Sequence, residues 1–200
     1  MIKIKHIAHS CFLIENDKEK LIIDPHDNTI GYEEIKENVN YIIISHDHYD
    51  HNYIENITLT DNVGSFKIAK VNSFHDKEQG KLRGKNTIHI IETDGIKICH
   101  LGDLGHVLDN EQINEIGKID VLLVPTGGTY TLDSSEAVEV AEKLEASIVI
   151  PMHYETDKTN FNIEGVDEFI NKIEDRYEII KPNKNEIVYN SDDKNIVYVI

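Results

Sequence analysis

The segment from Ser45 to His51 places three imidazoles and two carboxylates within seven residues, directly after the apolar run Tyr41–Ile44. Such an apolar run predicts a buried strand. Imidazole nitrogen and carboxylate oxygen suit borderline divalent metals, and alternating positions let several donors converge on a small volume. The alternative is a His-rich polar tract, but such tracts are normally of low complexity and lie in terminal or linker segments. The cluster therefore predicts metal ligands at the end of a buried strand.

The length of 200 residues is within the range of one domain, so we expect a single domain over residues 1–200. Hydrophobic residues make up 40% of the chain and charged residues 28%, which is typical of a folded globular protein. The first residues alternate as a strand does, and no apolar run approaches the length of a signal peptide core or a membrane span. We therefore expect a cytoplasmic protein.

The charge and the cysteines narrow the choice of partners. Cys11 and Cys99 each lie in an apolar, strand-like segment, which predicts core residues and not metal thiolates. The formal net charge of −17, without a local basic patch, disfavours binding to nucleic acid or to an anionic membrane. We expect a small-molecule substrate. A homo-oligomer is an open alternative.

The apolar pattern predicts a strand-rich first half and a second half in which strands and helices alternate. Helices are expected at 51–56, 110–117, 133–145 and 165–173, the third with a capping box formed by Asp133 and Glu136. Strands are expected at 2–7, 11–15, 20–24, 41–45, 66–74, 86–92, 96–101, 120–125, 147–151, 177–180, 186–190 and 196–200. Two mixed sheets covered by helices, an α/β (α+β) fold, would account for this order.

Several polar residues outside the cluster follow the carboxyl end of an apolar strand. Because ligands and catalytic groups gather beyond strand ends in open α/β sheets, these residues can meet the cluster in space. They are Asp24, His75, His100, Asp103 and His153.

With these motifs the chain resembles the metallo-β-lactamase superfamily over nearly its whole length. The family signature His-x-His-x-Asp-His, followed by a separated His, Asp and His, is matched by His46, His48, Asp50, His51, His75, Asp103 and His153, and the early aspartate by Asp24. The stretches 9–15, 100–103 and 125–131 resemble the branch of small metal-dependent hydrolases that includes the ascorbate-6-phosphate lactonase. The resemblance implies a four-layer αβ/βα sandwich.

The resemblance also implies a role for each signature residue. One divalent metal would be held by His46, His48 and His75, the second by Asp50, His51 and His153, and Asp103 would bridge both. A hydroxide held between two cations is a strong nucleophile at neutral pH, and Asp50 would also orient it. Asp50 and Asp103 are therefore the expected catalytic carboxylates. Zinc is the first expectation, but His and Asp donors also accept manganese, iron or nickel.

Five further residues have two readings each. Asp24 orients a ligand histidine or forms a turn before Pro25. His9 faces the pocket or is a hydrogen-bonded structural histidine. His100 and His106 flank Asp103, and either contact substrate and protonate a leaving group or are structural. Tyr49 lines the cleft or packs beside it. His6, His26 and His89 carry no motif and are expected to be packing or surface residues.

The segment Gly127, Gly128, Thr129 and Tyr130 lies between an expected strand and an expected helix. Adjacent glycines let backbone amides approach a bound anion, and the start of a helix favours negative charge. A loop that only needs positive φ is the alternative.

The leading hypothesis is a dinuclear metallohydrolase that cleaves a lactone, ester, amide or phosphodiester in a small soluble substrate. A second hypothesis is a non-catalytic metal-binding or ligand-sensing domain on the same fold, although the complete ligand set argues against it. A third is a nuclease, which the acidic charge and the lack of a basic exosite disfavour.

Overall fold

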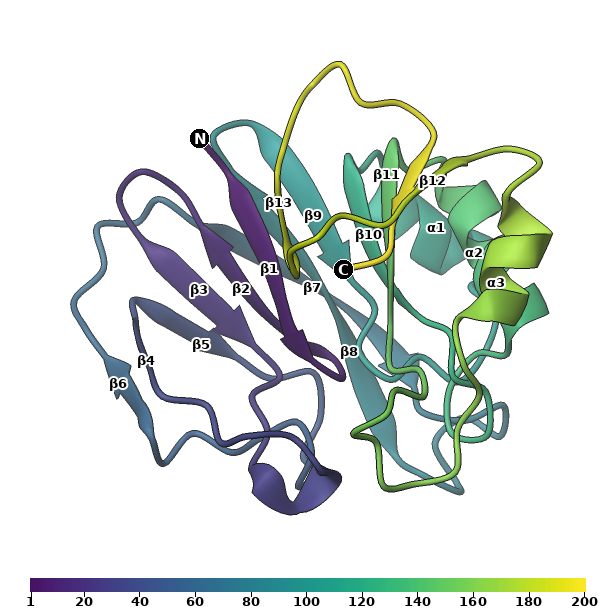
Figure 1. Cartoon of the computed structure of the whole chain (residues 1–200), viewed down its shortest axis with the longest axis horizontal. Helices are drawn as coiled ribbons and strands as arrows, with labels where there is room; N and C mark the ends of the chain where they lie inside the picture. The colour runs from purple at the N-terminus through teal and green to yellow at the C-terminus, as the bar shows by residue number, and fades with distance from the viewer.

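The computed structural model describes all 200 residues and consists of two sheets that face each other (Figure 1). The first sheet has five strands in the order β13-β1-β2-β3-β5. Its pairs are antiparallel except β3 with β5, which run parallel. Its strands are β1 (Lys3–Ala8), β2 (Cys11–Glu15), β3 (Lys20–Ile23), β5 (Tyr41–Ile43) and β13 (Glu186–Val188).

The second sheet has seven strands in the order β12-β14-β11-β10-β9-β8-β7. The pairs from β12 to β9 are parallel, and β8 and β7 extend the sheet with antiparallel pairing. Its strands are β7 (Lys67–Phe74), β8 (Lys85–Thr93), β9 (Ile96–His100), β10 (Val121–Pro125), β11 (Ile148–Met152), β12 (Glu178–Ile180) and β14 (Ile196–Tyr198).

Three helices cover the outer face of the seven-stranded sheet, on the right in Figure 1. They are α1 (Asn110–Ile116), α2 (Ser134–Leu144) and α3 (Asp167–Ile173). The predicted capping box of α2 is confirmed, since the Asp133 side chain accepts from the Glu136 N–H and the Glu136 side chain accepts from the Asp133 N–H. The apolar face of α2 is thereby fixed against the sheet.

The continuous apolar strands in the centre of the second sheet serve two cores. Val121 and Leu123 of β10 pack with residues of the first sheet, whereas Leu122 and Val124 pack under the helices. Successive side chains of a strand point to opposite faces, so a strand covered on both sides has no polar positions. The central strands are therefore immobilised from both faces, and their ends are rigid places for functional groups.

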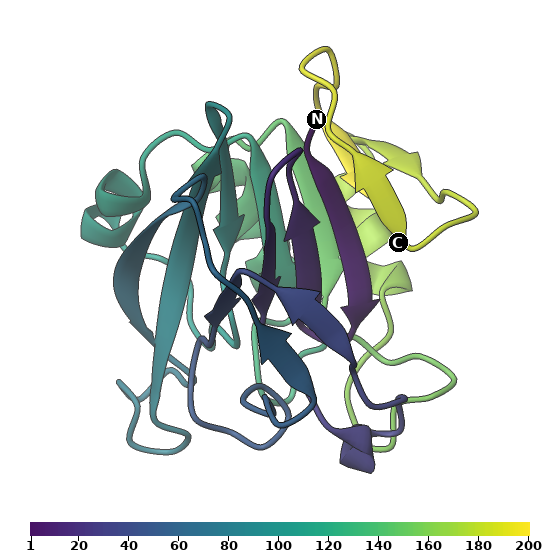
Figure 2. The same ribbon diagram turned by 90° about the vertical axis from the view of Figure 1, so that its left-hand side faces the viewer.

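The outer face of the five-stranded sheet is covered by a small parallel pair, β4 (Glu37–Val39) and β6 (Ile57–Leu59), which lies in front of that sheet in Figure 2. A third, smaller core joins Leu13 and Ile22 to Val39 and Ile57. The sequence did not predict these two short strands or the 3₁₀ turn Asn28–Ile30. The fourth layer of the sandwich is thus built here from strands and loops.

All twelve predicted strands are present, with ends shifted by no more than two residues. The predicted helices at 110–117, 133–145 and 165–173 are confirmed, but the one at 51–56 is wrong. That segment forms turns, in which the His51 N–H donates to the His48 carbonyl and the Tyr53 N–H donates to the Pro25 carbonyl. These bonds take the place of a helical pattern, and the His51 side chain is fully buried.

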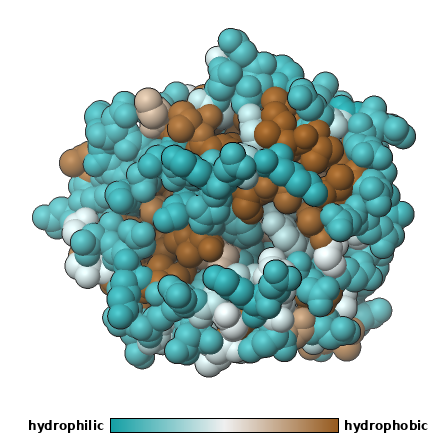
Figure 3. All heavy atoms as spheres, in the orientation of Figure 1, coloured by the Kyte–Doolittle hydropathy of each residue, from teal (hydrophilic) through white to brown (hydrophobic).

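The surface carries both polar and apolar areas. The face in Figure 3 is mostly hydrophilic, interrupted by a few hydrophobic areas. No helix has the length and apolar character needed to cross a bilayer.

Candidate metal centre

A single carboxylate oxygen lies at the middle of the histidine cluster. Asp103 Oδ2 is 3.1 Å from His75 Nε2, 3.2 Å from His51 Nε2, 3.3 Å from His153 Nε2 and 3.8 Å from His46 Nε2. All five side chains are buried. Four imidazole nitrogens directed at one buried carboxylate are the arrangement expected around cations that share an anionic ligand.

The donors fall into three overlapping groups, within each of which the ligand atoms lie within 4.8 Å of one another. The structure thus brings together all seven predicted ligands, and adds His9. The groups are His46, His48 and His75; His46, His51 and Asp103; and His9, Asp50, His51 and His153.

The donor chemistry fits divalent metals. His46 Nε2, His51 Nε2 and Asp103 Oδ1 are buried without a hydrogen-bond partner. A buried polar atom without a partner costs about 1–3 kcal/mol, so such atoms are rare unless they serve a ligand. Three of them on neighbouring side chains match a site for cations with nitrogen and oxygen ligands.

Asp24 fixes two of the histidines. Its carboxylate accepts from the Ser45 N–H and the Ser45 hydroxyl, both at 2.6 Å, and from His51 Nδ1 at 3.1 Å. Because the Ser45 hydroxyl gives its one proton to Asp24, its oxygen must accept from His46 Nδ1, 2.9 Å away. In each ring Nε2 is then the nitrogen that can bind a metal, once it carries no proton. Of the two readings of Asp24, this geometry fits the orienting one.

His75 is held in the same way by a backbone group. Its Nδ1 donates to the Tyr130 carbonyl at 3.1 Å, because a carbonyl oxygen can only accept. Nε2 of His75 is therefore the ring nitrogen that faces Asp103 and is placed to bind a metal.

Three residues at strand ends carry left-handed backbone. His9 (φ 54°) follows β1, Asp24 (φ 50°) follows β3 and His153 (φ 51°) follows β11. This conformation costs a residue other than glycine roughly 1–3 kcal/mol and is concentrated at functional sites. It turns each chain sharply at the sheet edge, so that the side chain points back into the centre.

Gly102 lets Asp103 approach. A Cβ at Gly102 would lie 2.3 Å from the Asn86 side-chain oxygen, which no ordinary residue tolerates. That same oxygen accepts the Asp103 N–H at 3.0 Å, while the Asn86 amide donates to the Leu101 carbonyl at 2.8 Å. Asn86 and Gly102 together set the position of Asp103.

The pKa values of His46, Asp103 and Asp24 suit metal binding, whereas that of His51 opposes it. Burial lowers the pKa of His46 to about 3, so this ring is neutral at pH 7. Burial alone would raise the pKa of Asp103, but His153 and His51 hold it well below its usual range. For Asp24, hydrogen bonding and attraction from His51 outweigh burial and lower the pKa to about 2. The ring of His51, between two carboxylates, has a pKa raised well above its usual value despite its burial. A metal at His51 must therefore displace a proton.

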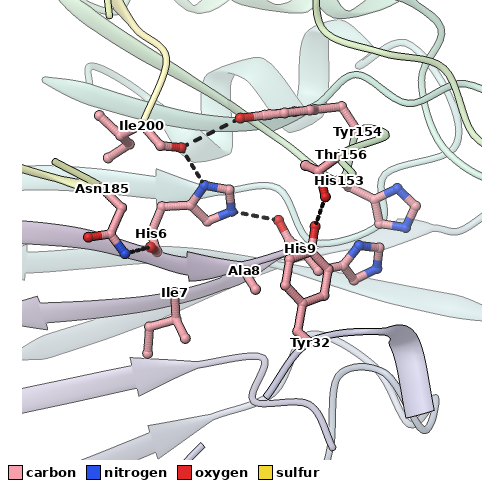
Figure 4. Close-up of a pocket in the computed structure, with 10 residues that line it drawn as sticks. All are labelled: His6, Ile7, Ala8, His9, Tyr32, His153, Tyr154, Thr156, Asn185 and Ile200. Carbon is pink, nitrogen blue, oxygen red and sulfur yellow. Dashed lines mark hydrogen bonds between the residues drawn. The ribbon is translucent and has the colours of Figure 1, made fainter. Parts of the chain in front are cut away.

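His9 belongs to the centre, although it is not one of the signature ligands. Its ring centroid is 4.0 Å from that of His153, and its Nε2 is 3.4 Å from Asp50 Oδ2. Figure 4 shows both rings beside a small cavity of about 140 Å³. In the same view, His6 Nε2 is 2.8 Å from the His9 carbonyl oxygen and His6 Nδ1 is 2.8 Å from the Ile200 carbonyl oxygen. Of the two readings of His9, the one that faces the pocket residues fits its position.

The hydrogen bonds of His100 and His106 fit the structural one of their two readings. His100 is fully buried, donates from Nε2 to the Ser10 carbonyl at 2.9 Å and accepts the Gly102 N–H at Nδ1. His106 accepts the Phe74 N–H at Nε2 and donates from Nδ1 to the Val107 carbonyl. Both nitrogens of each ring bond backbone groups, and neither ring lines the metal pocket, so the structural reading fits both residues better. His6, His26 and His89 are buried packing residues.

The glycine pair also has a structural reason. Gly128 has φ 59°, and its N–H donates to the Leu132 carbonyl. A Cβ at Gly127 would lie 2.1 Å from the His153 carbonyl oxygen. The loop alternative therefore fits, and the anion-binding amides that the sequence suggested are not available at Gly128. Tyr130 does reach the metal pocket, and the Thr129 carbonyl accepts from Arg83.

An open pocket of about 360 Å³ lies over the donors. Five of its nine lining residues are predicted ligands, and the other four are Tyr49, Arg83, Tyr130 and Phe161. The sequence reasoning missed Arg83 and Phe161. They lie in loops, and no local pattern indicates that these loops reach the cluster at residues 46–51.

The paired sheets and the His/Asp centre at their strand ends define an α/β metalloprotein. The family model of the β-lactamase superfamily domain matches residues 3–153. A UPF0173 metal-dependent hydrolase of Nanoarchaeum equitans is 33% identical, with coverage of 78% of this chain and 85% of that one. A UPF0173 metal-dependent hydrolase of Thermococcus onnurineus is 32% identical, with coverage of 78% and 86%.

Among solved structures, one from Thermotoga maritima is described as a zinc-dependent hydrolase of the metallo-β-lactamase superfamily. It superposes with a TM-score of 0.78 at 38% sequence identity, and the match covers 100% of this chain and 98% of that one. The chain therefore belongs to the metallo-β-lactamase superfamily, among its metal-dependent hydrolases.

Proposed function

We propose that the chain is one catalytic unit over residues 1–200 that hydrolyses a small molecule with two divalent metals. The observation that carries this proposal is Asp103 Oδ2, which has four histidine Nε2 atoms between 3.1 and 3.8 Å away. One bridging carboxylate with donors on both sides matches a two-metal site better than a single structural ion.

The ligands divide between two positions. His46, His48 and His75 would hold one cation, Asp50, His51 and His153 would hold the other, and Asp103 would be the ligand that both share. Zinc is the first expectation from the nitrogen and oxygen donors, and manganese, iron and nickel are the alternatives. Cations bound here supply Lewis acidity, which lowers the pKa of water and polarises the bond under attack.

The surrounding residues hold the donors in place. Asp24 and Ser45 keep the Nε2 lone pairs of His46 and His51 directed inward. We assign His9 as a positioning residue for Asp50, since their side chains approach to 3.4 Å. Asp50 in turn lies half-buried at the pocket floor, where it can direct an attacking water toward substrate.

The substrate is a small soluble molecule with a lactone, ester, amide or phosphodiester. A pocket of about 360 Å³ is at the lower end of the range for small-molecule sites. The net charge of −17 disfavours a nucleic acid. The resemblance to the ascorbate-6-phosphate lactonase branch and the cytoplasmic location stay predictions.

Metal analysis combined with turnover tests the proposal. The protein is loaded with zinc or manganese, dialysed, and assayed on a neutral p-nitrophenyl ester, a lactone and bis(p-nitrophenyl) phosphate. We expect two metals per chain and hydrolysis that stops on chelation and returns with metal. A protein that retains one metal or none, or that turns over equally well when metal-free, would contradict the proposal.

A further inference from the structure

Arg83 is the one lysine or arginine among the nine residues that line the metal pocket. The remaining lining residues are His and Asp donors and the aromatic rings of Tyr49, Tyr130 and Phe161. The chain has 37 acidic residues against 20 lysines and arginines, so the average field over the protein repels anions. A guanidinium at the pocket therefore places a positive charge beside the metal donors of a protein that is acidic as a whole.

The guanidinium of Arg83 is held in place but not neutralised. Its Nη2 donates to the Thr129 carbonyl at 3.2 Å, and its Cζ lies 5.5 Å from the centre of the Tyr130 ring. No carboxylate lies within 4.0 Å of it, although the neighbouring Lys77 pairs with Glu136. A guanidinium has five N–H donors, so most of those of Arg83 are left for a ligand.

The loop that carries Arg83 is fixed to the metal centre. The buried carboxylate of Asp76 accepts the backbone N–H groups of Glu78, Gly80, Leu82 and Arg83 at 2.7 to 3.0 Å. The His75 N–H donates to the Gly84 carbonyl, which closes the loop next to a metal donor. The distance from Arg83 to the donors is thus set by the fold, and Asp76 is occupied by amides and does not serve as the counter-ion of Arg83.

We infer that the substrate carries a second, oxyanionic group, a carboxylate or a phosphate, that binds Arg83 while the scissile bond lies over the metal donors. This inference rests on the proposed hydrolase function. A planar guanidinium with free paired N–H groups matches the two oxygens of either anion, and the Tyr130 ring keeps it oriented. The three aromatic rings of the pocket would contact the part of the substrate between its two ends.

Binding by matched small anions tests the inference without turnover. Butyrate, with one carboxylate, is compared by calorimetry with succinate, glutarate and adipate, and with 4-phosphonobutyrate for the phosphate source, on the metal-loaded protein. We expect the best diacid or the phosphonate to bind roughly 10–100-fold more tightly than butyrate, the range for a charged hydrogen-bonded pair. Tighter binding of a diacid would identify the second group as a carboxylate, and tighter binding of 4-phosphonobutyrate would identify it as a phosphate.

Two variants of the same loop make the comparison specific. Arg83→Gln should abolish the tighter binding of the diacid or the phosphonate relative to butyrate. The affinity for butyrate and the metal content should stay unchanged. Lys77→Gln removes one positive charge from the same loop outside the metal pocket, and should keep the preference. A preference that survives in Arg83→Gln, that falls equally in both variants, or that is absent from the wild type would overturn the inference. Failure of the proposed hydrolase function is a different result, namely the loss of bound metal or of ester turnover.

Discussion

The floor and the rim of the metal pocket differ in burial and in the elements that carry their residues. The floor residues His46, His51, Asp103 and His153 are buried and follow strands or tight turns that two cores immobilise. The rim residues Tyr49 and Tyr130 are 61% and 38% exposed and lie in loops. Sheets that fix the donors while loops shape the opening allow one chemistry to serve different substrates. Changes in the floor should therefore alter metal binding, and changes in the rim should alter only substrate preference.

The largest effect is expected from Asp103→Asn in the floor. Asparagine keeps the shape but removes the negative charge to which four histidine nitrogens point. Loss of an outer partner of a ligand costs about 10–100-fold in metal affinity or activity, so loss of the bridge should cost more than about 100-fold. Elemental analysis and turnover measure both quantities.

The matched control for this change is Asp192→Asn at an exposed position of the acidic surface. It should behave as the wild type. If Asp103→Asn kept both metals and full turnover, the bridging role would be wrong, and with it the distinction between floor and rim.

Asp24→Asn should have the next largest effect. An amide can present N–H donors toward the Ser45 N–H or His51 Nδ1, so at least one hydrogen bond of the carboxylate is lost. We expect metal affinity to fall about 10–100-fold while the fold is retained. A titration against a competing chelator measures the change. Unchanged affinity would mean that Asp24 only completes a turn before Pro25.

The floor could be predicted from the sequence because its evidence is local. The cluster at residues 46–51 and the separated His75, Asp103 and His153 each follow a recognisable apolar segment, and the ends of strands converge at one edge of the sheets. The helices and longer strands could be predicted for the same reason, since their periodicity reflects burial.

The rim, and the segment beside the cluster, depend on contacts between distant loops. Arg83 meets Tyr130 because Asp76 folds its loop and because Gly128 turns the other one. At residues 51–56 the local pattern predicted a helix. The segment forms turns instead, in which the Tyr53 N–H donates to the distant Pro25 carbonyl and the His51 N–H donates to the His48 carbonyl. The two readings of His100 and His106 could not be separated from the sequence, because closeness to Asp103 along the chain does not reveal that backbone groups occupy both ring nitrogens.

A smaller effect is expected from Tyr49→Ala at the rim. Its ring lines the pocket and is 61% exposed, so its removal takes away contact area without opening the core. We expect KM to rise about 2–10-fold, as for the loss of one aromatic contact, with kcat and metal content unchanged. Leu82→Ala is the control, since Leu82 is 68% exposed and does not line this pocket. A fall in metal content in Tyr49→Ala would show that the rim also supports the floor.

The smallest effect on chemistry is expected from Glu19→Gln, far from both regions. The Glu19 carboxylate accepts from the Ser65 N–H at 2.7 Å, from the Val63 N–H and the Ser65 hydroxyl, and from Tyr41 at 3.3 Å. Glutamine keeps the size and loses the charge, so we expect the free energy of unfolding to fall by about 1–3 kcal/mol, the range for hydrogen bonds to a charged group. Metal content and kcat should not change.

The pH dependence of the difference in unfolding free energy between the wild type and Glu19→Gln identifies the cause of that difference. Burial would raise the pKa of Glu19, but the hydrogen bonds from Ser65 and Val63 outweigh it and place the pKa below its ordinary value. A carboxyl whose pKa is depressed in the folded state adds stability above its unfolded pKa of about 4.3, and that contribution disappears as the pH falls through the folded value. Urea unfolding of the wild type and Glu19→Gln, both treated with chelator, should therefore differ most near pH 7 and converge in acid. A difference that stays constant down to acid pH would mean that the substitution acts through packing and not through the charge of Glu19.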